Sequence, residues 1–103
     1  MVPVNSRQFM LDLIGHLSLP VVLAARSTLG TINHTLLSLR ALRDARLSVC
    51  GVVLIGPENL ENQKAIEYYG DVRIAGLIPE LKEINRQTLC DTFVRHFTRE
   101  LFA

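Results

Sequence analysis

A polar run with one glycine, at residues 26–31, follows an apolar segment and precedes a stretch with helical spacing. Gly30 and Thr31 therefore stand at the start of an expected helix. The first N–H groups of a helix have no partner inside it, and the helix dipole adds partial positive charge there, so a carboxylate or phosphate is favoured. The same pattern also fits an ordinary turn with a helix cap, and the spacing alone leaves both interpretations open.

A loop able to wrap a triphosphate is not found in this sequence. The segment Gly-x-x-x-x-Gly-Lys-Ser/Thr does not occur, and no other glycine-dense loop follows an apolar run. We therefore assign no catalytic residue and expect that the chain does not carry out phosphoryl transfer by itself.

Histidines and cysteines give no metal or thiol site by their spacing. His16, His34 and His96 have no second ligand at metal-binding distance in the sequence. His34 falls in the first turn of an expected helix, where it could bond locally or face a partner, and the other two are expected at the surface. Cys50 and Cys90 each lie in an apolar stretch, so both are expected to pack as small hydrophobic side chains.

Composition limits the chain to one core and excludes several classes of partner. The chain has 103 residues, of which 49% are hydrophobic, and a formal charge of +1. This balance implies no broad basic surface for nucleic acid. The longest apolar run, 19–25, is far shorter than the roughly 20 residues that span a bilayer, so neither a membrane nor secretion is expected. The default location is the reducing cytoplasm.

Apolar residues recur at helical spacing in four segments of the chain. The first segment, residues 6–17, is expected to start at a cap formed by Asn5 or Ser6. The third is expected to end at Gly70, because glycine readily adopts the left-handed conformation at a helix end. The second helix is expected over 32–45, the third carries Ala65, Ile66 and Tyr69, and the fourth carries Leu89, Phe93, Phe97 and Leu101.

Two continuous apolar runs, at 20–25 and 49–55, and a further short strand expected at 72–77 alternate with these helices. Such runs are typical of strands buried on both faces, and the first is expected to be a central strand. Strands joined by helical crossovers pair in parallel. The expected fold class is α/β, a partial parallel sheet of about three strands with flanking helices. Residues 1–103 form one expected partial domain, in which residues 1–5 look like the tail of a further strand.

The loops that follow the three expected strands are the candidate ligand site. Ligands of open parallel sheets bind in the crevice beyond the carboxyl ends of the strands. The loops at 26–31, 56–61 and 78–83 would all face that crevice.

Residues 19–39 carry a more specific pattern than a generic glycine turn. Their core is Leu-Gly-Thr-Ile-Asn-His-Thr-Leu at 29–36. With this core the chain resembles the dethiobiotin synthetases, and the resemblance continues in family order to about Pro79. It includes Val2-Pro3-Val4-Asn5, Gly51-Val52-Val53-Leu54, Asn62 through Gly70, and Gly76-Leu77-Ile78-Pro79.

The resemblance implies a P-loop NTPase-type fold and a cytoplasmic ligase of biotin biosynthesis that is usually a homodimer. Such an enzyme uses ATP, magnesium and carbon dioxide to close the ureido ring of dethiobiotin on diaminopelargonate. By this resemblance Gly30, Thr31, Ile32 and Asn33 would receive the distal carboxylate of diaminopelargonate, typically across the dimer interface.

The resemblance also implies a nucleotide-binding wall made by the loops after Leu54 and Leu77. Ile55 and Gly56 belong to the first of these loops, and Pro79 and Glu80 to the second. The family commonly has Asn at the position of Ile55, where it contacts the adenine edge. Isoleucine offers no donor or acceptor, and a lost contact of this kind costs roughly 1 kcal/mol.

The family's phosphate loop, catalytic lysines and magnesium-binding acidic residues precede the part that this chain resembles. The leading hypothesis is therefore a carboxyl-terminal portion of a dethiobiotin synthetase that is inactive alone and needs an amino-terminal complement. The alternative is a noncatalytic binding or assembly module that keeps the substrate-carboxylate and dimer surfaces.

Overall fold

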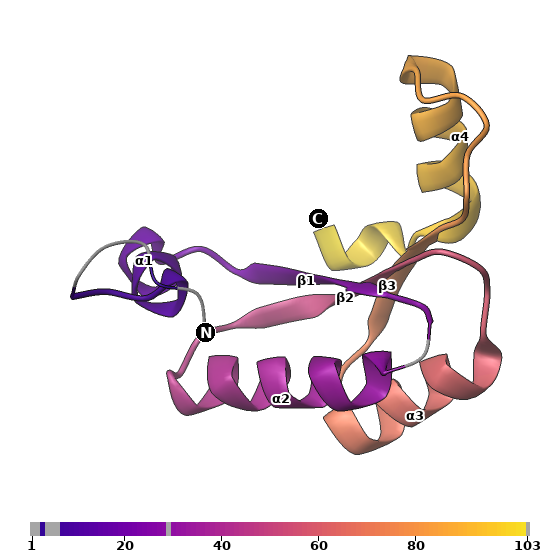
Figure 1. The fold of residues 1–103 in the computed structure, drawn as a ribbon. Helices are drawn as coiled ribbons and strands as arrows, with labels where there is room; N and C mark the ends of the chain where they lie inside the picture. The colour runs from indigo at the N-terminus through magenta and orange to yellow at the C-terminus, as the bar shows by residue number, and fades with distance from the viewer. Residues whose placement is uncertain (1–2, 4–6, 29, 103) are drawn as a thin grey trace.

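The computed structural model describes residue 3, residues 7–28 and residues 30–102. Helices and strands alternate along the chain, as the apolar periodicity predicts (Figure 1). The elements are α1 (Met10–Leu17), β1 (Val21–Arg26), α2 (Thr31–Asp44), β2 (Val49–Ile55), α3 (Leu60–Gly70), β3 (Ile74–Ile78), α4 (Arg86–His96) and the 3₁₀ helix η1 (Arg99–Phe102).

A parallel sheet of three strands, in the order β1-β2-β3, forms the centre of the described chain. The predicted fold class, a small parallel α/β sheet with flanking helices, is confirmed. The prediction that the first strand is central is wrong, because β2 is the strand with a neighbour on each side.

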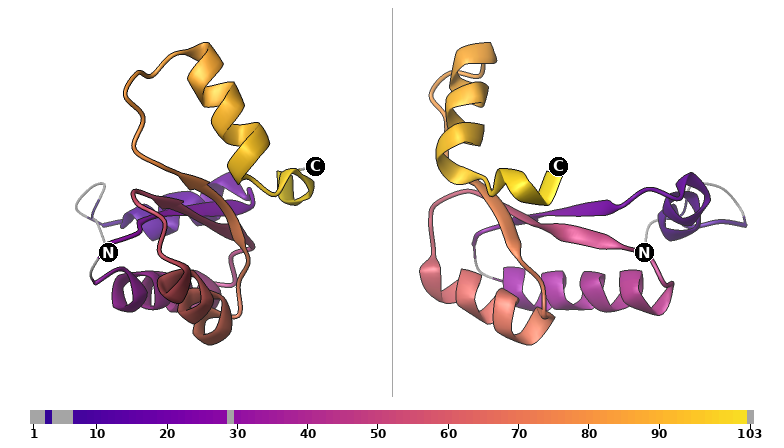
Figure 2. Two further views of the ribbon diagram at one scale, coloured as in Figure 1. Left: turned by 90° about the vertical axis from the view of Figure 1, so that its right-hand side faces the viewer. Right: turned by 180° about the vertical axis from the view of Figure 1, so that it is seen from behind.

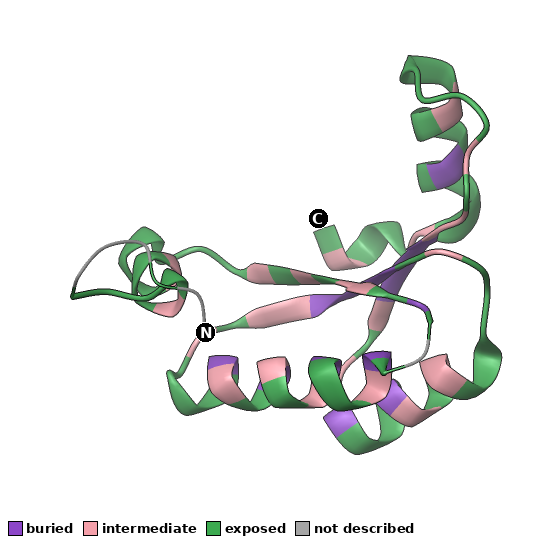
Figure 3. Ribbon diagram, in the orientation of Figure 1, coloured by how far each residue is buried: buried purple, intermediate pink, exposed green. Residues whose placement is uncertain are grey.

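The hydrophobic core lies between the sheet and the helices α2 and α3. These two helices cover one face of the sheet, whereas α4 and η1 lie on the opposite side (Figure 2). The most deeply buried side chains come from both layers, as Figure 3 shows by colour. The core cluster consists of the buried residues Leu39, Val52, Leu54, Ile66 and Leu77.

Strand β1 is buried on one face alone, which corrects the prediction of burial on both faces. Val21, Leu23 and Ala25 are partly buried, and Leu23 and Ala25 pack against the core, whereas the residues between them are exposed. The helical elements beyond the other face contact β2 and β3, where η1 packs on β2 and α4 on β3. The outer face of β1 therefore remains open in the described part of the chain.

Helix α1 begins at Met10, four residues later than predicted from its apolar stripe. The predicted caps, Asn5 and Ser6, and the predicted strand tail lie outside the described residues, apart from Pro3, which forms an isolated antiparallel bridge with Phe9. Asp12 Oδ2 accepts a hydrogen bond of 2.8 Å from the Phe9 N–H and closes the first turn. No residue of α1 is buried, so its apolar stripe does not join the core.

The end of α3 is built differently from the prediction. Gly70 is the last helical residue, and the left-handed cap is Asp71, with φ 46°. A Cβ at Gly70 would lie 2.9 Å from Leu39 Cδ1, so glycine is needed here for close packing against α2. The Arg43 guanidinium donates to the carbonyl oxygens of Gly70 and Asp71, and a cation at this end also suits the helix dipole.

The predicted final helix is interrupted at Phe97, so its apolar stripe belongs to two elements. Phe97 is extended and bridges Gly76 in antiparallel fashion, and the Thr98 N–H donates to Ala75 O at 2.8 Å. A Cβ at Gly76 would lie 2.5 Å from the Phe97 ring, so the glycine makes room for that ring. Pairing with the outer edge of β3 thus replaces one turn of helix.

Replacing Leu39 by Ala should lower the free energy of unfolding by about 2–5 kcal/mol, because a side chain that is 1% exposed leaves a cavity between α2 and the sheet. Leu37→Ala is the matched control in the same helix, since Leu37 is 60% exposed, and it should cost less than about 0.5 kcal/mol. Urea denaturation followed by circular dichroism measures both values. Equal losses for the two variants would contradict this core.

Candidate functional site

The loops after the three strands lie at one edge of the sheet and are joined by main-chain hydrogen bonds. The Ser27 N–H donates to Ile55 O at 3.0 Å, and the Gly56 N–H donates to Ile78 O at 2.9 Å. Asn62 Nδ2 adds a side-chain bond of 3.2 Å to Ser27 O. The loops that were predicted to lie at one edge of the sheet are therefore connected there.

The start of α2 opens onto a hollow of about 390 Å³. Gly30 precedes the helix with φ 88°, a left-handed conformation that glycine adopts without strain. All four residues predicted to receive the carboxylate, Gly30 to Asn33, line this hollow, together with Leu36 and Asn62. The helix start faces space that a ligand could fill, and its dipole favours an anion there.

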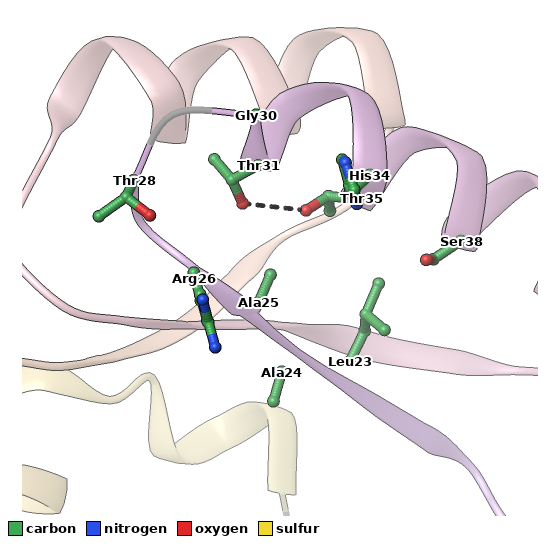
Figure 4. A pocket seen from close by; sticks show the side chains of 10 residues that line it. All are labelled: Leu23, Ala24, Ala25, Arg26, Thr28, Gly30, Thr31, His34, Thr35 and Ser38. Atoms are coloured by element: carbon green, nitrogen blue, oxygen red, sulfur yellow. Dashed lines mark hydrogen bonds between the residues drawn. The ribbon is translucent and has the colours of Figure 1, made fainter. Parts of the chain in front are cut away.

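A second hollow, of about 380 Å³, lies on the other side of the helix start, between β1 and α2 (Figure 4). The hydroxyl oxygens of Thr31 and Thr35 are 3.3 Å apart in its wall, and both threonines are buried. The complete lining is Leu23, Ala24, Ala25, Arg26, Thr28, Gly30, Thr31, His34, Thr35 and Ser38.

Sequence reasoning did not identify this second hollow. Thr31, Thr35 and Ser38 repeat at intervals of four and three residues, which places them on one face of a helix. That polar stripe beside the apolar one was a usable signal. His34, which was predicted either to bond locally or to face a partner, lies in the same wall and is exposed. Its main-chain N–H donates to Gly30 O at 3.2 Å.

The four residues predicted to flank a nucleotide base come together at the ends of β2 and β3. Ile55 pairs in register with Ile78, the residue before Pro79, and the Ile55 side chain is 45% exposed. Glu80 is exposed at the start of the following loop. Gly56 adopts φ 128°, and a Cβ there would lie 2.6 Å from Ser27 Oγ, so the turn requires glycine.

Ser27 is a buried polar residue that sequence reasoning also missed. It is 2% exposed, and its Oγ has no hydrogen-bond partner among the described residues. A buried hydroxyl without a partner costs about 1–3 kcal/mol. No pattern in the sequence separates this serine from other polar loop residues.

Histidine and cysteine positions partly follow the predictions. His16 and His96 are exposed, as expected. Cys50 is partly buried, and its Sγ lies 3.6 Å from Leu101 O. Cys90 is exposed on α4, so the prediction that it packs as a small hydrophobic side chain is wrong. Within residues 7–28 and 30–102, no three His, Cys, Asp or Glu side chains are grouped as metal ligands.

Among the described residues, no helix combines the length and the apolar character that a membrane crossing requires.

A three-stranded parallel sheet with an anion-favouring helix start at its carboxyl edge is typical of nucleotide-handling α/β domains. The family model described as "AAA domain", a P-loop NTPase-type domain, matches residues 1–88, and the chain belongs to this family.

Curated relatives make the comparison more specific. The chain is 51% identical over 88 residues to the biotin biosynthesis bifunctional protein BioCD of Bordetella avium. These residues are 85% of this chain and 19% of that protein. It is 43% identical over 103 residues to the ATP-dependent dethiobiotin synthetase BioD of Rhodopseudomonas palustris, covering 100% of this chain and 49% of the relative.

The dethiobiotin synthetase BioD of Paramagnetospirillum magneticum is 47% identical over 89 residues, which are 86% of this chain and 43% of the relative. The resemblance to the dethiobiotin synthetases is thus confirmed. The chain spans about half, or less, of the length of these relatives and corresponds to the carboxyl-terminal part of the dethiobiotin synthetases.

Gly56→Ala should destabilise the chain by about 1–3 kcal/mol, because alanine is strained at φ 128° and its Cβ would meet Ser27 Oγ. Ser27→Gly in the Gly56→Ala background removes the collision but not the strain, so it should recover part of the loss. Chemical denaturation of both single variants and the double variant measures the coupling. Strict additivity of the two substitutions would contradict a collision between Ser27 Oγ and a Cβ at position 56.

Proposed function

We propose that residues 1–103 are one partial domain, the carboxyl-terminal half of a dethiobiotin synthetase-like domain. Its activity would be the ATP- and magnesium-dependent closure of the ureido ring of diaminopelargonate with carbon dioxide, in biotin biosynthesis. The identities of 43% to 51% with biotin-biosynthesis proteins support this proposal. The observation that carries it is the hollow at the start of α2, which all four expected carboxylate-binding residues line.

The chain would contribute the binding site for the carboxylate end of the substrate, which does not take part in ring closure. The Thr31 N–H donates to Thr28 O at 3.2 Å, so the main-chain N–H groups of Ile32 and Asn33 hold the carboxylate of diaminopelargonate at the positive end of the α2 dipole. Ile32 and Leu36 line the same hollow and suit the hydrocarbon chain of a fatty acid. Binding at this end orients the diamine for ring closure elsewhere.

The nucleotide base would lie against Ile55, Gly56, Pro79 and Glu80. Ile55 is half exposed beside the Ile78–Pro79 segment and presents an apolar surface to a base. Its side chain donates no hydrogen bond, so discrimination of adenine falls to main-chain groups. Among the described residues, no three His, Cys, Asp or Glu side chains are grouped to hold magnesium, so its ligands would come from outside this part of the chain.

Catalysis would depend on residues outside this chain. The sequence contains no glycine-rich phosphate loop, and electrostatic clamping of the phosphoryl group supplies most of the rate in such reactions. The chain would therefore need an amino-terminal complement that supplies this loop. As in the family that it resembles, the complete sites would form in a homodimer in the cytoplasm. Turnover of diaminopelargonate, ATP and bicarbonate by the purified chain alone would contradict this.

A noncatalytic binding module is the second candidate. It is supported by the hollow in front of α2, because Gly30 to Asn33, Leu36 and Asn62 line it and binding an acid there requires no phosphate loop. A module of this kind would bind diaminopelargonate without ATP and would not restore ring closure when the amino-terminal half of a relative is added. Restored turnover would decide for the enzyme portion.

Asn33→Asp should weaken binding of diaminopelargonate roughly three- to tenfold at low salt, because a negative charge in the first turn of α2 repels the carboxylate. Tyr68→Asp is the matched control, since it adds the same charge at a residue of α3 that is 80% exposed and outside the hollow. Isothermal titration calorimetry at two salt concentrations measures both affinities. Equal affinity of the two variants would remove the carboxylate from this helix start.

A further inference from the structure

Asn62 connects the first turn of α3 with the turn that precedes α2. Its Nδ2 atom donates a hydrogen bond of 3.2 Å to Ser27 O, a residue 35 positions earlier in the chain. A carbonyl oxygen only accepts hydrogen bonds, so the nitrogen of the Asn62 amide must face Ser27. The bond therefore fixes which way this amide is turned.

The amide of Asn62 keeps unused hydrogen-bonding capacity. A side-chain amide has two N–H donors and one oxygen acceptor, and the bond to Ser27 O uses a single donor. Within the described part of the chain, the second Nδ2 hydrogen and Oδ1 of Asn62 have no partner. The side chain is also partly buried, which limits its contact with water. An unused donor is thus held at a fixed place in the loop region.

Asn62 lines the hollow in front of α2, together with Gly30 to Asn33 and Leu36. Asn33 carries the other side-chain amide of this wall, and it is exposed. Because the Asn62 amide is already held by Ser27 O, it loses little conformational freedom when a ligand binds. Of the two amides, Asn62 is therefore the better preorganised donor.

The starts of two helices lie at this hollow. Strands β1 and β2 are parallel, so α2 and α3, which follow them, both begin at the carboxyl edge of the sheet (Figure 1). Thr31 is the first residue of α2, and Asn62 is the third residue of α3. Glu58 and Glu61 are exposed and do not line the hollow. Both helix dipoles place partial positive charge here, which favours an anion over a cation as the partner of Asn62.

We propose that Asn62 is a further binding residue for the carboxylate of the substrate, to which it donates the second hydrogen of Nδ2. This inference rests on the proposed function, and it adds a side-chain donor to the main-chain N–H groups of Ile32 and Asn33. A hydrogen bond to a charged carboxylate is stronger than one between two uncharged groups. Asn62 therefore contributes to the selection of a charged acid over its ester.

The test is a nuclear magnetic resonance titration of the isotope-labelled 103-residue chain with diaminopelargonate. The two Nδ2 hydrogens of Asn62 give separate signals, because rotation about an amide bond is slow. We expect the acid to shift the signal of the second hydrogen by more than that of the hydrogen bonded to Ser27 O. If neither signal moves while the amide signals of Ile32 and Asn33 do, this inference is overturned and the proposed function stands.

Asn62→Ala removes both donors and should weaken binding of the acid roughly tenfold, whereas binding of the methyl ester should change less than about threefold. Gln63→Ala is the matched control, since it removes the same chemical group from the next residue of α3, which does not line the hollow. It should bind the acid as the original chain does. Isothermal titration calorimetry measures these affinities. Equal weakening of acid and ester by Asn62→Ala would contradict a bond to the charged group.

The amide signals of Ile32 and Asn33 show whether the helix start is intact in Asn62→Ala. At saturating acid they should shift as far as in the original chain, because the main-chain groups of α2 are unchanged. If they do not, Asn62 acts only through the turn before α2, and the direct bond is rejected. If this variant does not fold, the titration of the original chain decides, since it needs no substitution.

Nonanoate separates this inference from the proposed function. It has the carbon chain and the carboxylate of diaminopelargonate but neither amino group, so it tests acid binding alone. If nonanoate shifts the second Nδ2 hydrogen of Asn62 and diaminopelargonate does not bind, the proposed substrate is rejected and the acid contact is kept. If neither acid shifts a signal of Asn62, Ile32 or Asn33, both this inference and the proposed carboxylate site are rejected.

Discussion

Parallel pairing of β1 with β2 is the interaction on which the rest of the structure depends. Its register, with Ala25 opposite Leu54 and Arg26 opposite Ile55, ends in the hydrogen bond from the Ser27 N–H to Ile55 O. That bond fixes where the chain leaves the sheet. The turn through Gly30 then sets the start of α2 at the carboxyl edge, with a hollow on each side of it. A slip in this register would move the helix start away from both hollows.

The same pairing leaves the chain with half of a nucleotide-handling domain's features. An electrostatically favourable helix end, the hollow in front of it and the proposed wall for a base lie along one sheet edge, whereas no phosphate loop occurs in the sequence. Such a division is physically reasonable, because the carboxylate of a substrate can be held far from the bonds that form. It is also consistent with an outer β1 face and edge that remain open.

Periodicity and turn chemistry predicted much of this fold. The stripe containing Leu39 and Leu42 is buried as expected, and the helix start at Gly30 lies where the polar run ends. The errors have tertiary causes that a single sequence does not contain. Phe97 leaves its helix because it pairs with Gly76, and the apolar run of β1 is open on one face because no described element covers it. Asn62 and Ser27 join the candidate site through contacts across about 35 residues of chain, which no local pattern reports.

The central claim is that the start of α2 binds a carboxylate through its main-chain N–H groups. The most direct measurement is a nuclear magnetic resonance titration of the labelled chain with diaminopelargonate and, separately, with its methyl ester. The account predicts that the acid shifts the amide signals of Ile32 and Asn33, and that the uncharged ester binds at least about tenfold more weakly. Equal binding of acid and ester, or shifts confined to other residues, would contradict it.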